Sequence, residues 1–286
     1  MTLTYKGLGK TTRLGNQMFY YSVLRSVGIK LGFSIKIPKR KMDLLYFNIQ
    51  KDYLIAQDEI TINKTYTEPS YSFSDKVFDV QDNTNLVGHF KSSLYFNSIR
   101  DILLKEFTLD KYKMSFIDSY IGKIRRENPG SKLIALHVRR GDYVQYPDVH
   151  PFCPMIYYNK CIGYFNSKYK CKYIIFSDDI SWCKQNFRFA NNHFCELNNN
   201  LIELLLMARC DHNIIANSTF SWWGAYLNEN PDKKIFYPDK WFGENSGTGN
   251  LLPESWTIVI DCIMTISLGA PYNDNCYKLV AGVIKI

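Results

Sequence analysis

Short apolar runs alternate with helical stretches along the second half of the chain. The apolar runs stand at residues 132–138, 172–177, 193–197, 212–216 and 233–238. Stretches at 154–165, 179–187, 199–210 and 218–228 carry apolar residues at helical spacing. Continuous apolar strands that alternate with helices are typical of a parallel sheet covered on both faces. The pattern predicts a Rossmann-like α/β domain.

The first half of the chain has a different pattern. Apolar residues at helical spacing predict a helix over 15–32, and a strand-like run at 33–38 follows it. The polar stretch 61–85 favours a long surface loop or short strands, and two amphipathic helices are expected at 93–107 and 111–127. The turn sequence at residues 128–130 sets the predicted boundary between domain 1–129 and domain 130–286.

Composition excludes disorder as the main state and leaves the ligand open. Hydrophobic residues make up 46% of the 286 residues and charged residues 22%, which allows a packed core. Lys and Arg exceed Asp and Glu by 35 to 27, so the net charge of +8 suits nucleic acid, a lipid surface or a nucleotide-linked metabolite. The eight cysteines form no CxxC pair and are expected to be reduced and mostly buried. Without a signal peptide or a membrane span in the sequence, we expect a soluble, cytoplasmic protein.

Basic side chains follow the first apolar run of the second domain. Period-2 alternation places His137 and Arg139 on one face of the strand and Arg140 on the other. Two guanidinium groups beside a glycine, at the carboxyl edge of a sheet, suit a phosphate or pyrophosphate. The alternative is an arginine pair that forms salt bridges with Asp142.

Two further strand ends carry polar residues. Asp178 and Asp179 can accept hydrogen bonds from sugar hydroxyls or a base, or they can cap the following helix. The third strand passes into Asn217, Ser218 and Thr219, which can present a helix N-terminus to a phosphate or form a plain cap. One basic, one acidic and one helix-N-terminal strand end on the same sheet favour a nucleotide diphosphate.

Several other ligand signals are missing from the sequence. A P-loop ending at Lys10 and Thr11 would need glycine at position 4, where Thr4 stands. The chain has no GxGxxG, no Asp-x-Asp, and no zinc-type spacing of histidines and cysteines. We therefore predict no metal site.

Four sequence blocks carry a resemblance to a known family. They are RLGNQMFYYS at 13–22, HVRRGDY at 137–143, IIFSDDISWCKQNF at 174–187 and HNIIANSTFSWWGAYLN at 212–228. With these blocks, the chain over residues 12–260 resembles the glycosyltransferase family 11 α-1,2-fucosyltransferases. The resemblance implies a GT-B fold of two Rossmann-like domains facing a cleft. It also implies inverting, metal-independent transfer of L-fucose from GDP-β-L-fucose to the 2-hydroxyl of a terminal galactose.

The resemblance assigns roles by motif. His137 and Arg139 would hold the donor, with Arg139 on the β-phosphate, and Arg140 would brace the motif. Asn16 would approach the fucose from the N-terminal domain. The other implied donor contacts are Asp142, Asp178 or Asp179 on the guanine or ribose, Asn217, Ser218, Thr219, Phe220 and Ser221.

The general base and the acceptor contacts stay open. Asp142, Asp148 and His150 are candidates for the base, and transfer without a base is a further option. Trp222 and Trp223 can stack on a sugar or belong to the core. The sequence gives no acceptor glycan and no oligomeric state.

Two departures from the family leave alternatives in place. Thr12 and Arg13 stand where the family has a glycine pair, and residues 262–286 match nothing in it. The alternatives are a nucleic-acid-binding protein, a GDP-fucose-dependent enzyme of different linkage, and a relative that has lost catalysis.

Overall fold

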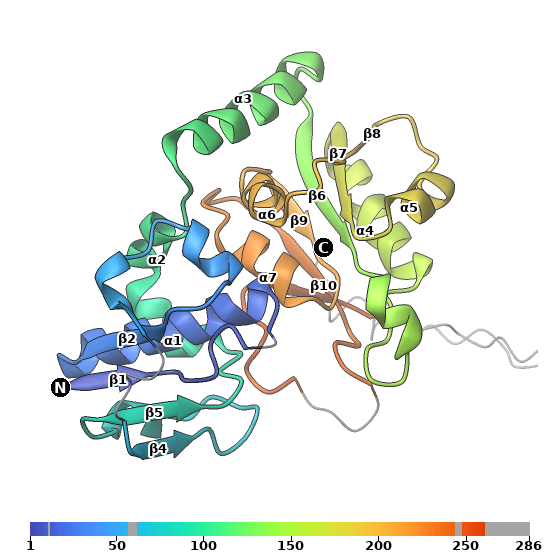
Figure 1. Ribbon diagram of the computed structural model, residues 1–286. Helices are drawn as coiled ribbons and strands as arrows, with labels where there is room; N and C mark the ends of the chain where they lie inside the picture. The colour runs from blue at the N-terminus through green and yellow to red at the C-terminus, as the bar shows by residue number, and fades with distance from the viewer. Residues whose placement is uncertain (11, 57–61, 244–247, 261–286) are drawn as a thin grey trace, which may run out of the picture. The chain divides into compact units, whose positions relative to one another are not determined.

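The computed structural model describes residues 1–10, 12–56, 62–243 and 248–260. It contains two compact units (Figure 1), of which the first comprises Met1–Asp118 and Gly247–Pro253. The second comprises Ser119–Ser246 and, of the described residues that follow, 254–260. The change from one unit to the other falls inside helix α3 (Lys111–Glu127), before the turn at residues 128–130 that we used as the boundary.

The second unit is built on a six-stranded parallel sheet in the order β11-β10-β9-β6-β7-β8. The chain starts in the middle at β6, moves outward through β7 and β8, and then crosses to β9 on the other side of β6. This is the Rossmann strand order, whose switch point lies between β6 and β9. The strands are β6 (Lys132–Val138), β7 (Cys171–Ser177), β8 (Asn192–Phe194), β9 (His212–Ile214), β10 (Ile235–Pro238) and β11 (Thr257–Val259).

Helices cover both faces of this sheet (Figure 1), which explains the uninterrupted apolar strands. Alternate residues of β6, Ile134 and Leu136, pack against Tyr157 and Phe165 of α4 (Met155–Lys168). Residues of α5 (Ile180–Asn186) belong to the same core cluster. Helices α6 (Asn200–Ala208) and α7 (Thr219–Tyr226) pack against each other. The predicted Rossmann-like domain is confirmed.

The first unit carries a five-stranded parallel sheet in the order β3-β2-β1-β5-β4. Its switch point lies between β1 and β5, because the chain leaves β1 in one direction and returns on the other side. The elements are β1 (Thr2–Thr4), α1 (Leu14–Leu31), β2 (Ser34–Pro38), β3 (Leu54–Ile55), β4 (Lys64–Thr67), β5 (Thr84–Val87) and α2 (Arg100–Glu106). The predicted helix at 15–32 and the short strands in 61–85 are confirmed.

The helix predicted over 93–107 is wrong in its first half. The structure has 3₁₀ turns at Ser93–Tyr95 and Asn97–Ile99, and α2 begins only at Arg100. Phe96 leaves the helical region (φ −143°, ψ 8°) and packs its ring 5.9 Å from that of Phe19, centroid to centroid. Burial of this ring in the core outweighs the local helical periodicity.

Two sequence expectations concern the thiols and the membrane. The described cysteines, at 153, 161, 171, 183, 195 and 210, are buried and free, as expected. Cys262, Cys276 and the segment 262–286 lie outside the described residues. Within the described ranges, none of the helices combines the length and the apolar character needed to span a membrane.

Candidate functional site

The candidate site lies at the carboxyl edge of the second sheet. Strands β9, β6 and β7 are neighbours, and each of the three predicted strand ends follows one of them. Arg139 follows β6, Asp178 follows β7, and Ser218 follows β9 by a few residues. The switch point between β6 and β9 is where open α/β sheets bind their ligands. The predicted convergence of the three strand ends is confirmed.

Arg139 is held in place by two carboxylates and a ring. Its Nη1 lies 2.8 Å from Oδ2 of Asp178, and its Nη2 contacts Asp142. Its guanidinium carbon lies 5.2 Å from the ring centre of Tyr143. The side chain is only 15% exposed, so these contacts fix a guanidinium that carries further N–H donors toward the edge of the sheet. The predicted salt bridge to Asp142 is present.

Arg140 faces away from Arg139, as the alternation predicts. Its Nε lies 3.3 Å from Oδ2 of Asp179, and its guanidinium lies 4.2 Å from the ring centre of Trp182. Asp179 also caps α5, because its Oδ1 accepts the backbone N–H of Trp182 at 3.0 Å. Arg140 and Asp179 therefore brace the turn from β7 into α5, and the capping alternative for Asp179 is present in the structure.

Asp178 ties the β6 and β7 ends together. Besides its pair with Arg139, its Oδ1 accepts the backbone N–H of Arg140 at 2.9 Å. A Cβ atom at Gly141 would overlap Oδ2 of Asp178. The glycine of the arginine block is therefore required by the close approach of this carboxylate.

Tyr143 is a member of the site that the sequence analysis missed. Its hydroxyl donates to the backbone oxygen of Asn217 at 2.9 Å, which connects the β6 end to the β9 end. Its ring lies beside the Arg139 guanidinium and stacks on His150, with centroids 4.6 Å apart. The available signal was its place as the last residue of the block at 137–143.

His137 is a buried imidazole with an unsatisfied nitrogen. It is 4% exposed, its ring centre lies 5.5 Å from that of Phe220, and its Nδ1 has no hydrogen-bond partner among the described residues. Burial lowers the pKa of His137 to about 4, against the opposing charge of Asp178. A buried polar atom without a partner costs about 1–3 kcal/mol, which a hydrogen bond from a ligand would recover.

The start of α7 is partly capped by its own side chains. The Ser218 hydroxyl accepts the backbone N–H of Phe220 at 3.4 Å. The Asn217 amide donates to the backbone oxygens of Pro151 at 2.6 Å and Trp241 at 3.0 Å. The Asn217 side chain therefore anchors neighbouring loops. Thr219 and Phe220 are half-buried and remain candidates for contacts with a donor.

Three of the predicted contacts belong to the core instead. Ser221, Trp222 and Trp223 have no exposed surface, and the Ser221 hydroxyl donates to the backbone oxygens of Ala216 and Ser218. The two indole rings pack on each other with centroids 5.0 Å apart. The interpretation of Trp222 and Trp223 as sugar-stacking residues is wrong, because helix α7 turns this side into the interior of the unit.

The candidates for the general base follow the arginine block. Asp142 is 39% exposed and contacts Arg139, Asp148 is exposed, and His150 stacks on Tyr143. The geometry of the unit does not select one of them, and the base stays a prediction.

Asn16 lies at the start of α1 in the first unit. Its Oδ1 is buried and has no hydrogen-bond partner among the described residues. The next residue, Gln17, donates to the backbone oxygen of Thr12 at 2.6 Å and accepts the N–H of Leu44 at 3.1 Å, which fixes the loop. Arg13 has φ −75°, and Thr12 is not among the described non-glycine residues with positive φ. The loss of the glycine pair therefore imposes no backbone strain.

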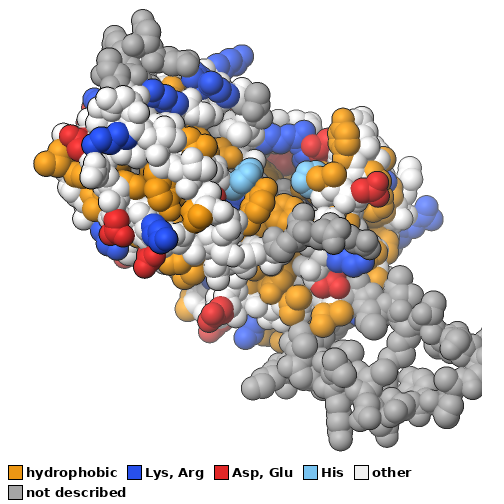
Figure 2. Space-filling view, turned by 90° about the horizontal axis from the view of Figure 1, so that it is seen from below, with side chains coloured by type: hydrophobic (Ala, Val, Ile, Leu, Met, Phe, Trp, Pro, Cys, Tyr) orange, Lys and Arg blue, Asp and Glu red, His pale blue; other side chains and the backbone are white. Residues whose placement is uncertain are grey.

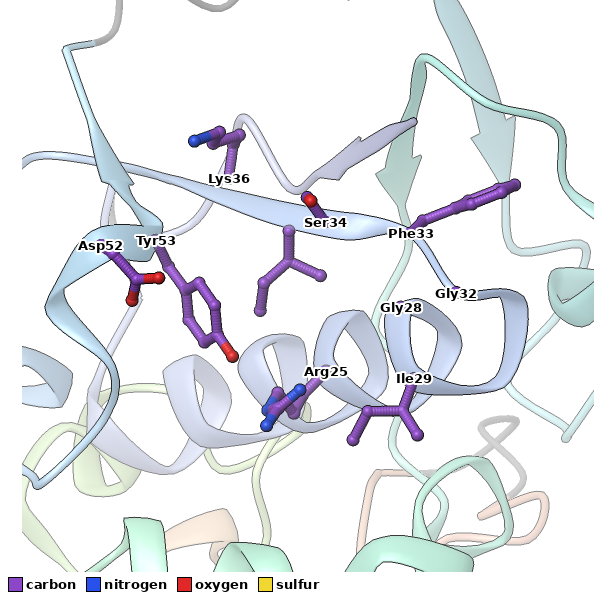
Figure 3. Close-up of a pocket in the computed structure, with 10 residues that line it drawn as sticks. Arg25, Gly28, Ile29, Gly32, Phe33, Ser34, Lys36, Asp52 and Tyr53 are labelled. Atoms are coloured by element: carbon purple, nitrogen blue, oxygen red, sulfur yellow. The ribbon is translucent and has the colours of Figure 1, made fainter.

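A surface hollow in the first unit lies at the opposite end of its sheet (Figure 3). Residues near the end of α1 and the beginning of β2 line it, among them Gly32 and Ser34, together with Tyr53. Its Arg25 already pairs with Glu106 at 3.0 Å. The hollow is distant in topology from the carboxyl edge and contributes none of the predicted residues. In the described part of the chain, no group of three or more His, Cys, Asp or Glu side chains is placed to hold a metal ion.

Comparison with known proteins places these features in a family. The sequence profile of Glycosyl transferase family 11 matches residues 7–243. The O-antigen biosynthesis glycosyltransferase WbnK of Escherichia coli is 30% identical, over 85% of this chain and 96% of its own. An α-1,2-colitosyltransferase of Escherichia coli is 28% identical over 85% and 94%. Galactoside α-(1,2)-fucosyltransferase 2 of Bos taurus is 24% identical over 81% and 76%.

The architecture also matches solved structures. The NodZ α-1,6-fucosyltransferase co-crystallized with GDP aligns with a TM-score of 0.52 and 14% identity, over 78% of this chain and 91% of that chain. This likeness concerns the fold alone. Together with the two parallel sheets, it shows the GT-B type of architecture that the resemblance implied.

Proposed function

The chain belongs to glycosyltransferase family 11, and from this premise we propose that it transfers L-fucose from GDP-β-L-fucose to the 2-hydroxyl of a terminal galactose. The relatives named for α-1,2 linkages support this linkage. The observation that carries the donor assignment is the pairing, at the Rossmann switch point, of an oriented arginine with a buried imidazole nitrogen that has no partner among the described residues.

Arg139 stabilises the leaving group in this proposal. As the bond between C1 of fucose and the phosphate oxygen breaks, the electron pair stays on GDP, and the galactose oxygen bonds to C1 from the opposite face. The growing charge on the diphosphate is met by Arg139 and by the N-terminus of α7. His137 and Thr219 complete the donor contacts at the same sheet edge.

The formal charges of the site explain why Asp142 matters. Arg139 and Arg140 contribute two positive charges, whereas Asp142, Asp178 and Asp179 contribute three negative charges. Asp178 is fixed by the backbone N–H of Arg140, but Asp142 is the most exposed of the three at 39%. We infer that the diphosphate displaces Asp142 from Arg139. Asp142 is then released next to the reacting centre, where it is one of the candidate bases together with Asp148 and His150.

We propose that transfer needs no metal ion. The guanidinium of Arg139 supplies a positive charge where a metal-dependent enzyme would place a divalent cation, and it is held by geometry rather than by coordination. The partners are GDP-fucose and a galactose-terminated glycan.

Nucleic acid is not favoured as the partner. A protein that tracks a nucleic-acid backbone gathers Lys and Arg in a groove lined with aromatic side chains. On the face seen in Figure 2, Lys and Arg lie in separate groups among hydrophobic and uncharged side chains. Arg139 and Arg140, which might have formed such a groove, each pair with carboxylates.

The test is release of GDP from GDP-fucose with and without lactose or N-acetyllactosamine, in EDTA, with the product linkage read by NMR. The proposal expects acceptor-dependent release and an α-1,2 bond. A different linkage would overturn the acceptor hydroxyl and leave the donor. Binding of GDP without use of GDP-fucose would point to another GDP-linked sugar, and colitose is the first to try because a relative is named for it.

A further inference from the structure

A pair of stacked, exposed rings lies in the loops at the carboxyl edge of the first sheet. Tyr71 and His89 are parallel within 16°, with ring centroids 4.8 Å apart, and the Tyr71 hydroxyl lies 3.3 Å from Nε2 of His89. Tyr71 is 51% exposed. His89 follows β5 and Tyr71 follows β4, so the pair lies beside the first sheet's switch point between β1 and β5. None of the donor residues discussed above involves it.

The turn that carries His89 is strained and held by a carboxylate. Phe90 has φ 48°, a left-handed conformation that costs an aromatic residue free energy, and its ring is fully buried. A Cβ atom at Gly88 would overlap the side chain of Glu68. Oε2 of Glu68 accepts the backbone N–H of His89 at 2.7 Å and that of Phe90 at 2.9 Å. The strained turn buries Phe90 and directs the preceding imidazole outward.

The loop that carries Tyr71 is held from both sides. The backbone N–H of Phe73 donates to Oδ1 of Asn250 at 3.0 Å, and that of Ser74 donates to the Tyr95 hydroxyl at 3.0 Å. The same hydroxyl donates to Oε1 of Glu68 at 3.0 Å, so Glu68 connects the two ring-bearing loops. An exposed ring pair is thus built into an ordered network, which lowers the entropy cost of binding a ligand there.

The charges around the pair suit a neutral ligand. Burial and the charge of Lys91 lower the pKa of His89, so the imidazole is uncharged at neutral pH. Burial lowers the pKa of Lys91 as well, and Glu68 opposes that shift. Glu68 is itself satisfied by two backbone N–H groups and a hydroxyl. No uncompensated charge is therefore offered to a phosphate.

We propose that Tyr71 and His89 form the platform on which the terminal galactose of the acceptor stacks. The inference rests on the proposed function for the identity of the sugar. Galactose presents an apolar face of C–H bonds beside a rim of hydroxyls, which matches a flat aromatic surface with polar atoms at its edge. The exposed face of Tyr71 takes the C–H face, and the ring nitrogens of His89 hydrogen-bond to a hydroxyl.

The test measures galactose binding and turnover in the full chain. Tyr71→Ala is expected to raise the KM for lactose about ten-fold, while GDP affinity measured by calorimetry stays at the wild-type value. Tyr71→Phe keeps the ring and is expected within about three-fold of wild type. Tyr46→Ala removes a tyrosine of the same unit that is 62% exposed and is the matched control, with an unchanged KM for lactose.

A second measurement separates this inference from the proposed function. Saturation-transfer NMR of methyl β-D-galactopyranoside is recorded with GDP present, for wild type, Tyr71→Ala and His89→Ala. A signal in wild type that falls in both variants supports the platform even if no galactoside accepts fucose, in which case the proposed function fails. Equal signals in all three proteins, or an unchanged KM for lactose in Tyr71→Ala, would overturn the platform.

Discussion

Replacing Arg139 with alanine tests the donor site most directly. The variant removes a guanidinium that is 15% exposed and positioned by Asp178 at 2.8 Å and by Asp142. Loss of one preorganised donor to a developing charge typically lowers kcat about 10²–10³-fold, equivalent to about 2.7–4 kcal/mol of transition-state stabilisation. We expect this loss in the rate of fucosyl transfer.

The same change has a smaller effect on stability. Asp178 is 27% exposed and keeps the backbone N–H of Arg140, and Asp142 is 39% exposed, so both carboxylates stay hydrated or bonded. A loss of about 1 kcal/mol is expected, which corresponds to about 2–4 °C in Tm for a unit of this size. Arg139→Lys keeps the charge but cannot contact both carboxylates as the planar fork does, and it is expected to restore only part of the activity.

The assay is acceptor-dependent GDP release, run beside thermal unfolding. Arg125→Ala is the matched control, because Arg125 forms a comparable pair with Asp211 at 3.0 Å in the same unit. That pair lies at the amino end of β6, where Asp211 accepts the N–H of Leu133. Wild-type activity in Arg139→Ala, or an equal loss of activity in Arg125→Ala, would refute the reasoning.

Three further outcomes follow from single contacts in the second unit. Tyr143→Phe loses the hydrogen bond to Asn217 but keeps the ring beside Arg139, so kcat/KM for GDP-fucose should fall about two- to twelve-fold, and Tyr143→Leu should fall further; equal values for Phe and Leu would contradict this. Gly141→Ala places a Cβ on Asp178 and should weaken GDP binding in calorimetry, whereas Gly163→Ala, where a Cβ meets nothing within 4 Å, should not. The folded-state pKa of His137 is about 4 against 6.5 for the unperturbed group, so its contribution to stability is complete above pH 6.5 and is lost as the pH falls from 6.5 to 4. Urea unfolding should show about 3 kcal/mol less stability from this group at the acid end, a loss absent in His137→Gln; equal pH profiles for the two proteins would exclude this origin.

Local patterning was enough to predict most of the second unit. The run at 132–138 coincides with β6, and the other apolar runs each overlap a strand of the same parallel sheet. A strand covered on both faces must be apolar throughout, so its sequence is readable without knowledge of its partners. The polar residues just beyond each run fall at the carboxyl edge for the same reason. The position of the donor site was therefore predictable.

The partners of those polar residues were decided by the tertiary structure. Asp178 pairs with Arg139 while its neighbour Asp179 pairs with Arg140, a choice set by the register of β6 against β7. Tyr143 reaches Asn217 only because β9 lies next to β6, across a chain crossover. Contacts between residues so distant in sequence leave no local signature.

The same distinction applies to burial and to the first unit. Helical spacing cannot say which side of α7 faces the interior, and the fold buries Trp222 and Trp223 completely. Nor could it foresee that Phe96 would leave the helix to pack on Phe19. Tyr71 and His89 come from a polar stretch and a separate turn, and Glu68 brings them together. The sequence alone determined the elements and the chemistry at their ends, because short-range periodicity records whether a residue faces core or solvent. The tertiary structure decided which of those side chains meet, because that depends on the order of the strands.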